Sequence, residues 1–304
     1  MFPEKTKFCP GYYCGRFPLP DGNLSECGAC PRGWRTIEPN SDSCVACTDE
    51  PSFYDWLFLT FMAILPLFFH WYYIDSKVEN TNLSRKLILS AVLEIVISSL
   101  LTVLLMEPRW QFKLYSCRIQ SLSDWYTFMY NPAPNFEDYI YCTQEVVYPL
   151  YTMIFIFYIF GVLSLLIIRP WFLDKNVDFN GGLVTLYAGL YLYPILAFIH
   201  AVCCGLIYYT FPYLIIIVSV ISNAVHFACK TNQTMEFLIK DTVTSCRNLF
   251  IVLIHWVCHA FGIIGITQLT DPFLHYPLLC LVPVPTLFYV LTSSLTNPDK
   301  LHSD

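Results

Sequence analysis

Charged residues are scarce in this chain. Asp, Glu, Lys and Arg together make up 13% of its 304 residues, whereas soluble proteins carry about 25%. So few charges cannot cover the surface of a 35.2 kDa soluble globule, and 56% of the residues are hydrophobic. The mean hydropathy of the chain is also high, at +0.50. Disordered chains have a low mean hydropathy, so this value excludes a disordered chain. The sequence therefore predicts a membrane protein.

The sequence also lacks a basic stripe, and its net charge is −6. A phosphate backbone demands clustered Lys and Arg, so we expect no nucleic-acid partner. Catalytic motifs are missing as well: there is no phosphate-binding glycine loop, no Gly-x-Ser-x-Gly elbow and no His-Glu-x-x-His. The two halves with matched broken helices that are typical of transporters are not found either. The sequence predicts neither an enzyme nor a bound cofactor.

Long apolar runs account for the high hydropathy. A membrane-spanning helix needs about 20 consecutive apolar residues. Six runs reach that length: 56–74, 87–106, 146–168, 183–229, 249–269 and 273–295. The fourth run has 47 residues without one Asp, Glu, Lys or Arg, and the aromatic residues and proline of 208–213 predict a tight hairpin at its middle. We therefore predict an all-α polytopic membrane protein with seven transmembrane helices.

Cysteines are plentiful, with fourteen in the chain. Eight of them lie in 1–52 and in the loop 107–145: Cys9, Cys14, Cys27, Cys30, Cys44, Cys47, Cys117 and Cys142. An even number on one side of a membrane is typical of disulfides in an oxidising lumen. These eight are our disulfide candidates, and the sequence leaves their pairing open. The Cys-x-x-Cys spacings of 27–30 and 44–47 also fit a zinc ribbon, which remains the alternative.

Charge and composition indicate how the chain is oriented. Residues 1–49 contain no apolar segment of the kind found in cleavable signal peptides, so we expect the first helix to act as a signal anchor. Nine of the 17 Lys and Arg residues fall in 75–86, 169–182, 230–248 and the tail. Positively charged loops stay in the cytosol, so we predict a luminal N-terminus and a cytosolic C-terminus. On the luminal side, Asn23 begins a glycosylation sequon, Asn-Leu-Ser.

These expectations divide the chain into three parts. Residues 1–52 form a luminal cysteine-rich module, and 53–295 form the seven-helix transmembrane domain, whose long luminal loop spans 107–145. Residues 296–304 form a short cytosolic tail. In the loop, aromatic and small polar residues alternate over 121–132. This pattern predicts a short interfacial helix capped by Ser123 or Asp124, or a surface that contacts a luminal partner.

Ionisable residues at membrane depth are costly and mark candidate functional sites. The candidates here are Glu94, His200, His226, His255 and His259. His255 and His259 share one helical face, as do Ser222 and His226. Three interpretations stay open: hydrogen bonds between helices, a zinc site similar to that of the ceramidase and adiponectin-receptor hydrolases, and a proton or solute path along Glu94 and His200. The spans contain no Asp of the kind that completes the hydrolase site, so we expect no metal.

Several short motifs resemble one known family, in the same order along the chain. They are Gly11-Tyr12-Tyr13-Cys14-Gly15, Cys27-Gly28-Ala29-Cys30-Pro31-Arg32-Gly33, Tyr54-Asp55-Trp56-Leu57, Ser123-Asp124-Trp125-Tyr126-Thr127, Val147-Tyr148-Pro149-Leu150-Tyr151-Thr152, His255-Trp256 and Leu281-Val282-Pro283-Val284-Pro285. Each motif is modest, but the collinear set is similar to the Jun-kinase-associated membrane protein family over nearly the whole chain.

That resemblance implies a seven-span endoplasmic reticulum protein that is not an enzyme. It implies an adaptor that recruits the proteasome to the membrane in the unfolded protein response and regulates the duration of stress-kinase signalling. The implied partners are proteasome subunits, the ER-associated degradation machinery, a membrane-anchored RING ubiquitin ligase, a stress-activated kinase and membrane lipid.

Overall fold

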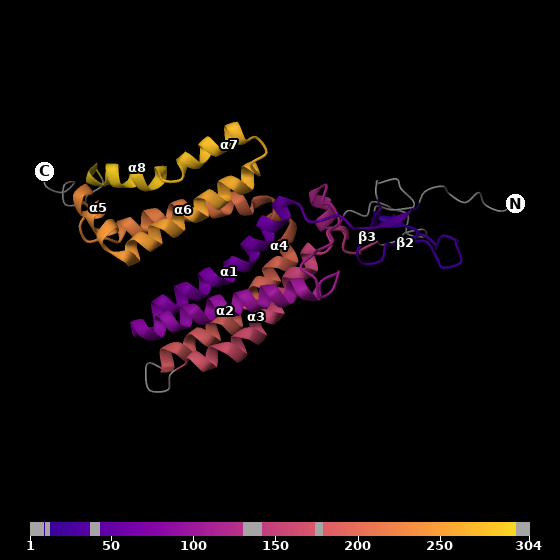
Figure 1. Ribbon diagram of the computed structural model, residues 1–304, viewed down its shortest axis with the longest axis horizontal. Coiled ribbons are helices and arrows are strands. Elements are labelled where there is room, and N and C mark those ends of the chain that lie inside the picture. The colour runs from indigo at the N-terminus through magenta and orange to yellow at the C-terminus, as the bar shows by residue number, and fades with distance from the viewer. Residues whose placement is uncertain (1–8, 10–12, 37–42, 130–141, 174–178, 296–304) are drawn as a thin grey trace. The chain divides into compact units, whose positions relative to one another are not determined.

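The protein is described by a computed structural model over residues 9, 13–36, 43–129, 142–173 and 179–295. It is predominantly helical, with a small strand module near the N-terminus (Figure 1). Within the described residues, six helical segments are long and apolar enough to cross a membrane. The predicted class, an all-α membrane protein with a disulfide-rich N-terminal module, is confirmed. The chain forms two compact units, unit 1 (Met1–Tyr208) and unit 2 (Tyr209–Asp304).

The described residues of 9–52, which we call the head, contain two short antiparallel hairpins. Strand β1 (Cys14–Gly15) pairs with β2 (Gly28–Ala29), and β3 (Trp34–Thr36) pairs with β4 (Cys44–Ala46). Strands this short bury little apolar surface, so disulfides must hold such a module together. Four are present: Cys9–Cys27, Cys14–Cys142, Cys30–Cys44 and Cys47–Cys117. All four cysteines of the zinc-ribbon alternative are therefore used in disulfides.

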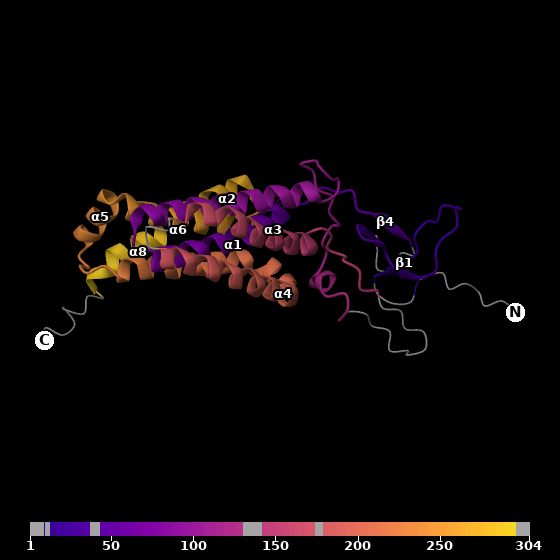
Figure 2. The same cartoon turned by 90° about the horizontal axis from the view of Figure 1, so that it is seen from below.

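Three apolar helices lie wholly within unit 1 and pack against one another (Figures 1 and 2). They are α1 (Phe53–Lys77), α2 (Thr81–Leu105) and α3 (Leu150–Phe172). The closest packing joins α2 to α3. A second contact region joins the C-terminal end of α1 to the N-terminal part of α2, where Ile74, Leu83 and Leu87 are buried.

Helices α1 and α2 begin several residues before their predicted starts, because polar caps extend each helix beyond its apolar run. At α1, the Ser52 hydroxyl accepts from the Asp55 N–H at 3.1 Å, and the Asp55 carboxylate accepts from the Ser52 N–H at 2.8 Å. At α2, the Asn80 side chain accepts from the N–H groups of Asn82 and Leu83, each at 3.0 Å. Such caps satisfy amide donors that the first helical turn leaves free.

The fourth apolar run forms one helix of 50 residues, α4 (Phe179–Ala228). The hairpin loop predicted over 208–213 is not present: these residues are helical, and the boundary between the units falls between Tyr208 and Tyr209. A membrane helix tolerates proline when another donor satisfies the carbonyl that proline leaves free. Pro212 cannot donate to the Tyr208 carbonyl, and the Tyr54 hydroxyl donates to that oxygen at 2.7 Å. Because α4 has the length of two spans, the count of seven remains a prediction.

Unit 2 continues from the second half of α4. Its further elements are α5 (Met235–Thr244), α6 (Cys246–Thr267), α7 (Pro272–Leu278), η2 (Leu279–Leu281), α8 (Val284–Thr292) and η3 (Ser293–Leu295). Helix α5 lies in the predicted cytosolic loop and is not anticipated by the apolar runs. The run 273–295 is divided into short helices, and Pro283 stands just before α8. The buried core contains Phe227, Leu238, Val252 and Val290.

Candidate functional site

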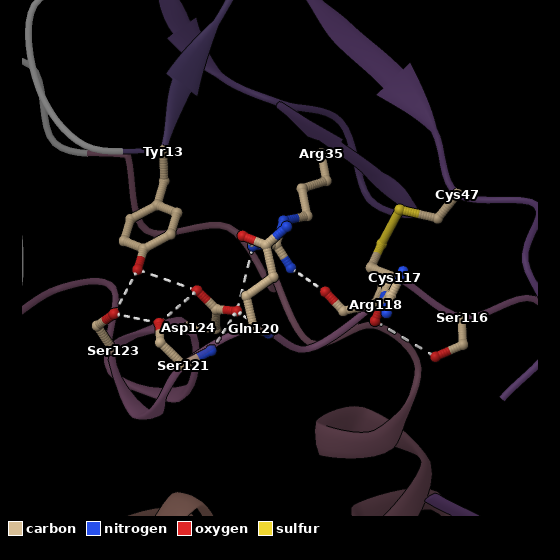
Figure 3. Close-up of polar contacts among 10 residues, drawn as sticks. All are labelled: Tyr13, Arg35, Cys47, Ser116, Cys117, Arg118, Gln120, Ser121, Ser123 and Asp124. Atoms are coloured by element: carbon tan, nitrogen blue, oxygen red, sulfur yellow. Dashed lines mark hydrogen bonds and ion pairs between the residues drawn. A yellow bond between two sulfur atoms is a disulfide. The ribbon is translucent and has the colours of Figure 1, made fainter. Parts of the chain in front are cut away.

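A polar network joins the head to the loop between α2 and α3, and we call it the junction (Figure 3). It consists of Tyr13, Arg35, Gln120, Ser121, Ser123 and Asp124. Two disulfides, Cys14–Cys142 and Cys47–Cys117, connect the same two segments. The head is therefore fixed to the loop covalently at two points, across sequence separations of 128 and 70 residues.

Asp124 is the centre of the junction. It is the third residue of the short helix η1 (Leu122–Trp125), and it is 3% exposed. One carboxylate oxygen accepts from the backbone N–H of Gln120 at 2.8 Å and of Ser121 at 3.3 Å. The predicted interfacial helix is thus present, but Ser121 occupies the capping position that we predict for Ser123 or Asp124.

Two side chains of the head reach Asp124 from the opposite side (Figure 3). Arg35 Nη2 lies 3.2 Å from Asp124 Oδ2, and the same guanidinium donates to the Gln120 side chain at 3.1 Å and to the Arg118 carbonyl. The Tyr13 hydroxyl lies 3.1 Å from Asp124 Oδ1. Burial raises the pKa of the Tyr13 phenol, and the Asp124 charge adds to that rise. A carboxylate with this many donors positions the head; it is not left open to a substrate.

The junction is seated on α1 and α4 through aromatic packing. The Trp125 ring lies 5.8 Å from the Phe58 ring and 5.1 Å from the Tyr208 ring, centroid to centroid. The Tyr208 hydroxyl donates to the buried Asp55 carboxylate at 2.7 Å. A Cβ atom on Gly205 would come within 2.8 Å of Trp125, so this close approach requires glycine. Two of the resemblance motifs, 54–57 and 123–127, therefore meet at this position.

The same loop exposes large apolar side chains. Trp110, Phe112, Phe128 and Met129 are 78%, 77%, 67% and 79% exposed. Trp110 and Phe112 follow the end of α2 by only a few residues. Exposed aromatic residues beside a membrane span contact either the lipid headgroup region or another protein. The loop is thus fixed in position by the junction and exposes large apolar side chains.

Glu94 of α2 has a buried counterion, Arg169 of α3. Arg169 Nη2 lies 2.7 Å from Glu94 Oε2 and Arg169 Nε lies 3.0 Å from Oε1, with both side chains 0% exposed. Ser90 donates to Oε1 at 2.6 Å, and Arg169 also donates to the Thr185 carbonyl of α4 at 3.1 Å. Arg169 Nη1 lies 3.5 Å from Nδ1 of the buried His70. The pair therefore ties four helices together.

Arg169 is missed by the sequence reasoning, which places it in a cytosolic segment. Arg169 stands at the end of an apolar run and just before Pro170, a position that is typical of a charged residue outside the membrane. The signal that could have found it is Glu94, because an isolated acid in an apolar helix requires a counterion at the same depth. Arg169 is buried, so it does not count as a cytosolic charge. The predicted cytosolic segments then hold eight Lys and Arg residues, the same number as the opposite side. The charge count alone therefore no longer favours one orientation.

The predicted intramembrane residues divide between the two units. Glu94 and His200 belong to unit 1 but have different partners, since His200 donates to the Tyr151 carbonyl at 3.0 Å. The remaining three, His226, His255 and His259, belong to unit 2.

In unit 2, the residues of the zinc-hydrolase alternative do not converge on one point. Ser222 Oγ lies 3.2 Å from His255 Nδ1, and His226 Nε2 is a buried atom without a hydrogen-bond partner among the described residues. In the part of the chain that the structure describes, no group of three or more His, Cys, Asp or Glu residues could hold a metal ion. This geometry favours hydrogen bonds between helices over the zinc-hydrolase interpretation.

Comparison with known proteins places these features in a family. The JNK1/MAPK8-associated membrane protein of Mus musculus is 37% identical over 97% of this chain and 96% of its own length. The protein of that name from Homo sapiens is 38% identical over the same shares. A homolog from Caenorhabditis elegans is 34% identical over 91% of this chain and 85% of its own length. No solved structure shows a significant match.

A family model described as JNK1/MAPK8-associated membrane protein matches residues 9–298. The match includes the head, the junction and every described helix. The chain therefore belongs to the JNK1/MAPK8-associated membrane protein family.

Proposed function

We propose that this chain is a non-catalytic adaptor of the endoplasmic reticulum membrane. It recruits proteasome subunits and the ER-associated degradation machinery, and it regulates the duration of Jun-kinase signalling by binding that kinase. It is itself a substrate of a membrane-anchored RING ubiquitin ligase. The observation that carries the proposal is the family: relatives that match over nearly the full length are named for association with a kinase.

The geometry supports an adaptor because two buried carboxylates, Asp124 and Glu94, are occupied by donors within the chain. Asp124 is surrounded by donors from the head and loop, and Glu94 is saturated by Arg169 and Ser90. A catalytic carboxylate must instead have room for a substrate within hydrogen-bond reach. Function then resides in exposed surfaces.

The chemistry of the head supports the proposed compartment. Disulfides persist in oxidising spaces such as the lumen of the endoplasmic reticulum and are rare in the cytosol. Asn23, the first residue of the sequon, is exposed in a turn where its N–H bonds to Asp21 at 3.1 Å. Both features, the disulfides and the exposed sequon, support a luminal head.

The proposed cytosolic docking surface is small. The segment 230–248 contains α5, on which Glu236 and Lys240 are exposed. A surface of this size binds weakly, so docking of a proteasome requires several such segments acting together. Exposed lysines of these segments, Lys240 among them, are also the proposed ubiquitin acceptors.

Affinity purification of the full chain from native membranes in a mild detergent tests the proposal. Mass spectrometry of the eluate should identify proteasome subunits, and metal analysis of the same sample should find no stoichiometric zinc. The variant Glu236→Lys/Lys240→Glu preserves net charge and reverses the exposed pair on α5. It should lower proteasome recovery by roughly fivefold, which corresponds to about 1 kcal/mol.

The matched control is Glu26→Lys, which changes an exposed charge in the head. It should leave proteasome recovery unchanged, because the head faces the lumen in this proposal. Recovery of no proteasome subunit with the parent chain, or equal loss in both variants, contradicts the proposal.

A further inference from the structure

Two exposed cysteines flank α5 at the ends of apolar helices. Cys229 follows the last residue of α4, and Cys246 is the first residue of α6. Both are exposed, and neither is in a disulfide. Each is followed directly by a basic residue, Lys230 or Arg247. Thiols at the ends of membrane helices beside basic residues are positioned for lipid modification.

A single carboxylate holds both cysteine positions beside α5. Lys230 Nζ lies 2.9 Å from Asp241 Oδ2, and Asn248 Nδ2 donates to the same oxygen at 2.9 Å. Lys230 is adjacent to Cys229, and Asn248 is two residues after Cys246. The end of α4 and the start of α6 are therefore fixed to one short helix, so the two thiols share one end of unit 2.

Further contacts fix α5 in place. The Gln233 side chain donates to the Phe227 carbonyl at 3.1 Å and to the Lys230 carbonyl at 2.8 Å, which satisfies acceptors at the end of α4. Leu238 of α5 is 1% exposed and packs against Phe227 and Val252. The segment between the cysteines is thus a positioned structure, not a loose loop.

The outer face of α5 carries an apolar stripe. Met235, Ile239 and Val243 are spaced by four residues, so they lie on one side of the helix, and they are 46%, 49% and 67% exposed. Ten residues are too few to cross a membrane. A short helix that is anchored on one side and apolar on an adjacent exposed side suits the membrane interface.

The neighbouring helices of unit 2 also expose apolar side chains near the ends that adjoin α5. Val225 near the end of α4 is 54% exposed, and Leu249 and Phe250 near the start of α6 are 39% and 56% exposed. Lys240 is exposed on α5 beside the stripe, and a basic residue there complements anionic headgroups. The two cysteines therefore lie where apolar surface gives way to charged surface.

We propose that Cys229 and Cys246 are S-acylation sites that carry fatty acyl chains in thioester linkage. In the reaction the cysteine sulfur attacks the carbonyl carbon of a fatty acyl coenzyme A. A carbon–sulfur bond to the protein forms, the bond to coenzyme A breaks, and coenzyme A leaves as a thiol that takes the cysteine proton. No oxidant or reductant is needed. The attached chains extend into the bilayer beside α4 and α6 and hold α5 at the interface.

This inference rests on the cytosolic placement of 230–248 in the proposed function, because acyl coenzyme A is available on that side. The test uses the full chain in cells fed an alkyne-tagged fatty acid, followed by purification and quantification of hydroxylamine-sensitive label. The parent should carry label at both cysteines. Cys229→Ser and Cys246→Ser should each lose about half of it, and the double variant should lose essentially all.

The matched control is Cys280→Ser. Cys280 is also exposed and outside any disulfide, but it lies in η2, within the apolar segment of residues 272–292. This variant should retain the full label, because a thiol at membrane depth is beyond the reach of a cytosolic acyl donor. Label that persists in the double variant, or label that disappears with Cys280→Ser, overturns the proposal.

A second readout separates this inference from the proposed orientation. After hydroxylamine treatment, a membrane-impermeant maleimide added outside sealed microsomes should modify both cysteines. If the maleimide modifies both cysteines while the parent carries no hydroxylamine-sensitive label, the acylation proposal fails and the proposed orientation stands. If it modifies neither, the orientation and the acylation proposal both fail.

Discussion

The buried pair of Glu94 and Arg169 makes a sharp prediction about stability. Replacing Arg169 by methionine removes the cation and keeps an unbranched side chain. Glu94, which is 0% exposed, would then keep only the Ser90 hydroxyl among its present side-chain donors. Removing one member of a buried ion pair leaves an uncompensated charge and costs about 3–5 kcal/mol. We expect Arg169→Met to lower the free energy of unfolding by that amount.

A double variant distinguishes the pair from its surroundings. Replacing both members of a buried pair by apolar residues is often neutral or stabilising, because no charge remains to be desolvated. Glu94→Met/Arg169→Met should therefore recover most of the stability lost in Arg169→Met. The double-mutant cycle should give a coupling energy of at least about 2 kcal/mol, as expected for residues in direct contact.

The assay is equilibrium unfolding of the purified full chain in mixed micelles with increasing dodecyl sulfate. The control is Lys113→Met, which breaks the exposed Lys113–Glu50 pair, whose side chains are 47% and 72% exposed. Solvent screening limits that loss to about 1 kcal/mol or less. The reasoning is refuted if Arg169→Met matches this control, or if the effects in the double variant are additive.

Three other predictions concern separate parts of the chain. Because burial raises the pKa of the Tyr13 phenol above 10.0, the stability from its hydroxyl is present below pH 10 and lost as pH rises through the raised pKa. The difference in thermal midpoint between the parent and Tyr13→Phe should therefore shrink at high pH, and a constant difference would contradict the contact with Asp124. Asn23→Gln should abolish the endoglycosidase-sensitive shift of the protein on a gel. Asn82→Gln should leave that shift unchanged, because Asn82 begins an Asn-Leu-Ser sequon in the predicted cytosolic segment 75–86. Gly161→Ala would bring a Cβ to 2.6 Å from the Tyr193 ring, so it should lower the free energy of unfolding by about 1–3 kcal/mol, and an unchanged value would argue against this packing.

The apolar runs predict the membrane helices because hydropathy is a local property. Six runs correspond to six apolar helical segments, although polar caps such as Ser52 and Asn80 shift the starts of α1 and α2. The prediction of a loop at 208–213 is wrong because a tertiary contact stabilises the helix there. Proline and aromatic residues suggest a break, but the Tyr54 hydroxyl satisfies the carbonyl that Pro212 leaves free.

The partners of individual side chains could not be predicted. Glu94 is recognisable as a buried acid, yet Arg169 lies 75 residues away in sequence. The eight candidate cysteines share two segments, but their pairing depends on how the loop meets the head. Helix α5 escapes notice because it is short and mixes polar with apolar residues. Its exposed stripe becomes visible only when Leu238 is seen to face the core.

The most direct test of the account is thiol alkylation of the head in sealed microsomes after protease is added outside. We expect the head to survive the protease. Its six cysteines, together with Cys117 and Cys142 of the loop, should react with the alkylating reagent only after reductant is added in denaturant. Digestion of the head from outside, or eight reactive thiols without reductant, would contradict a luminal, disulfide-bonded head.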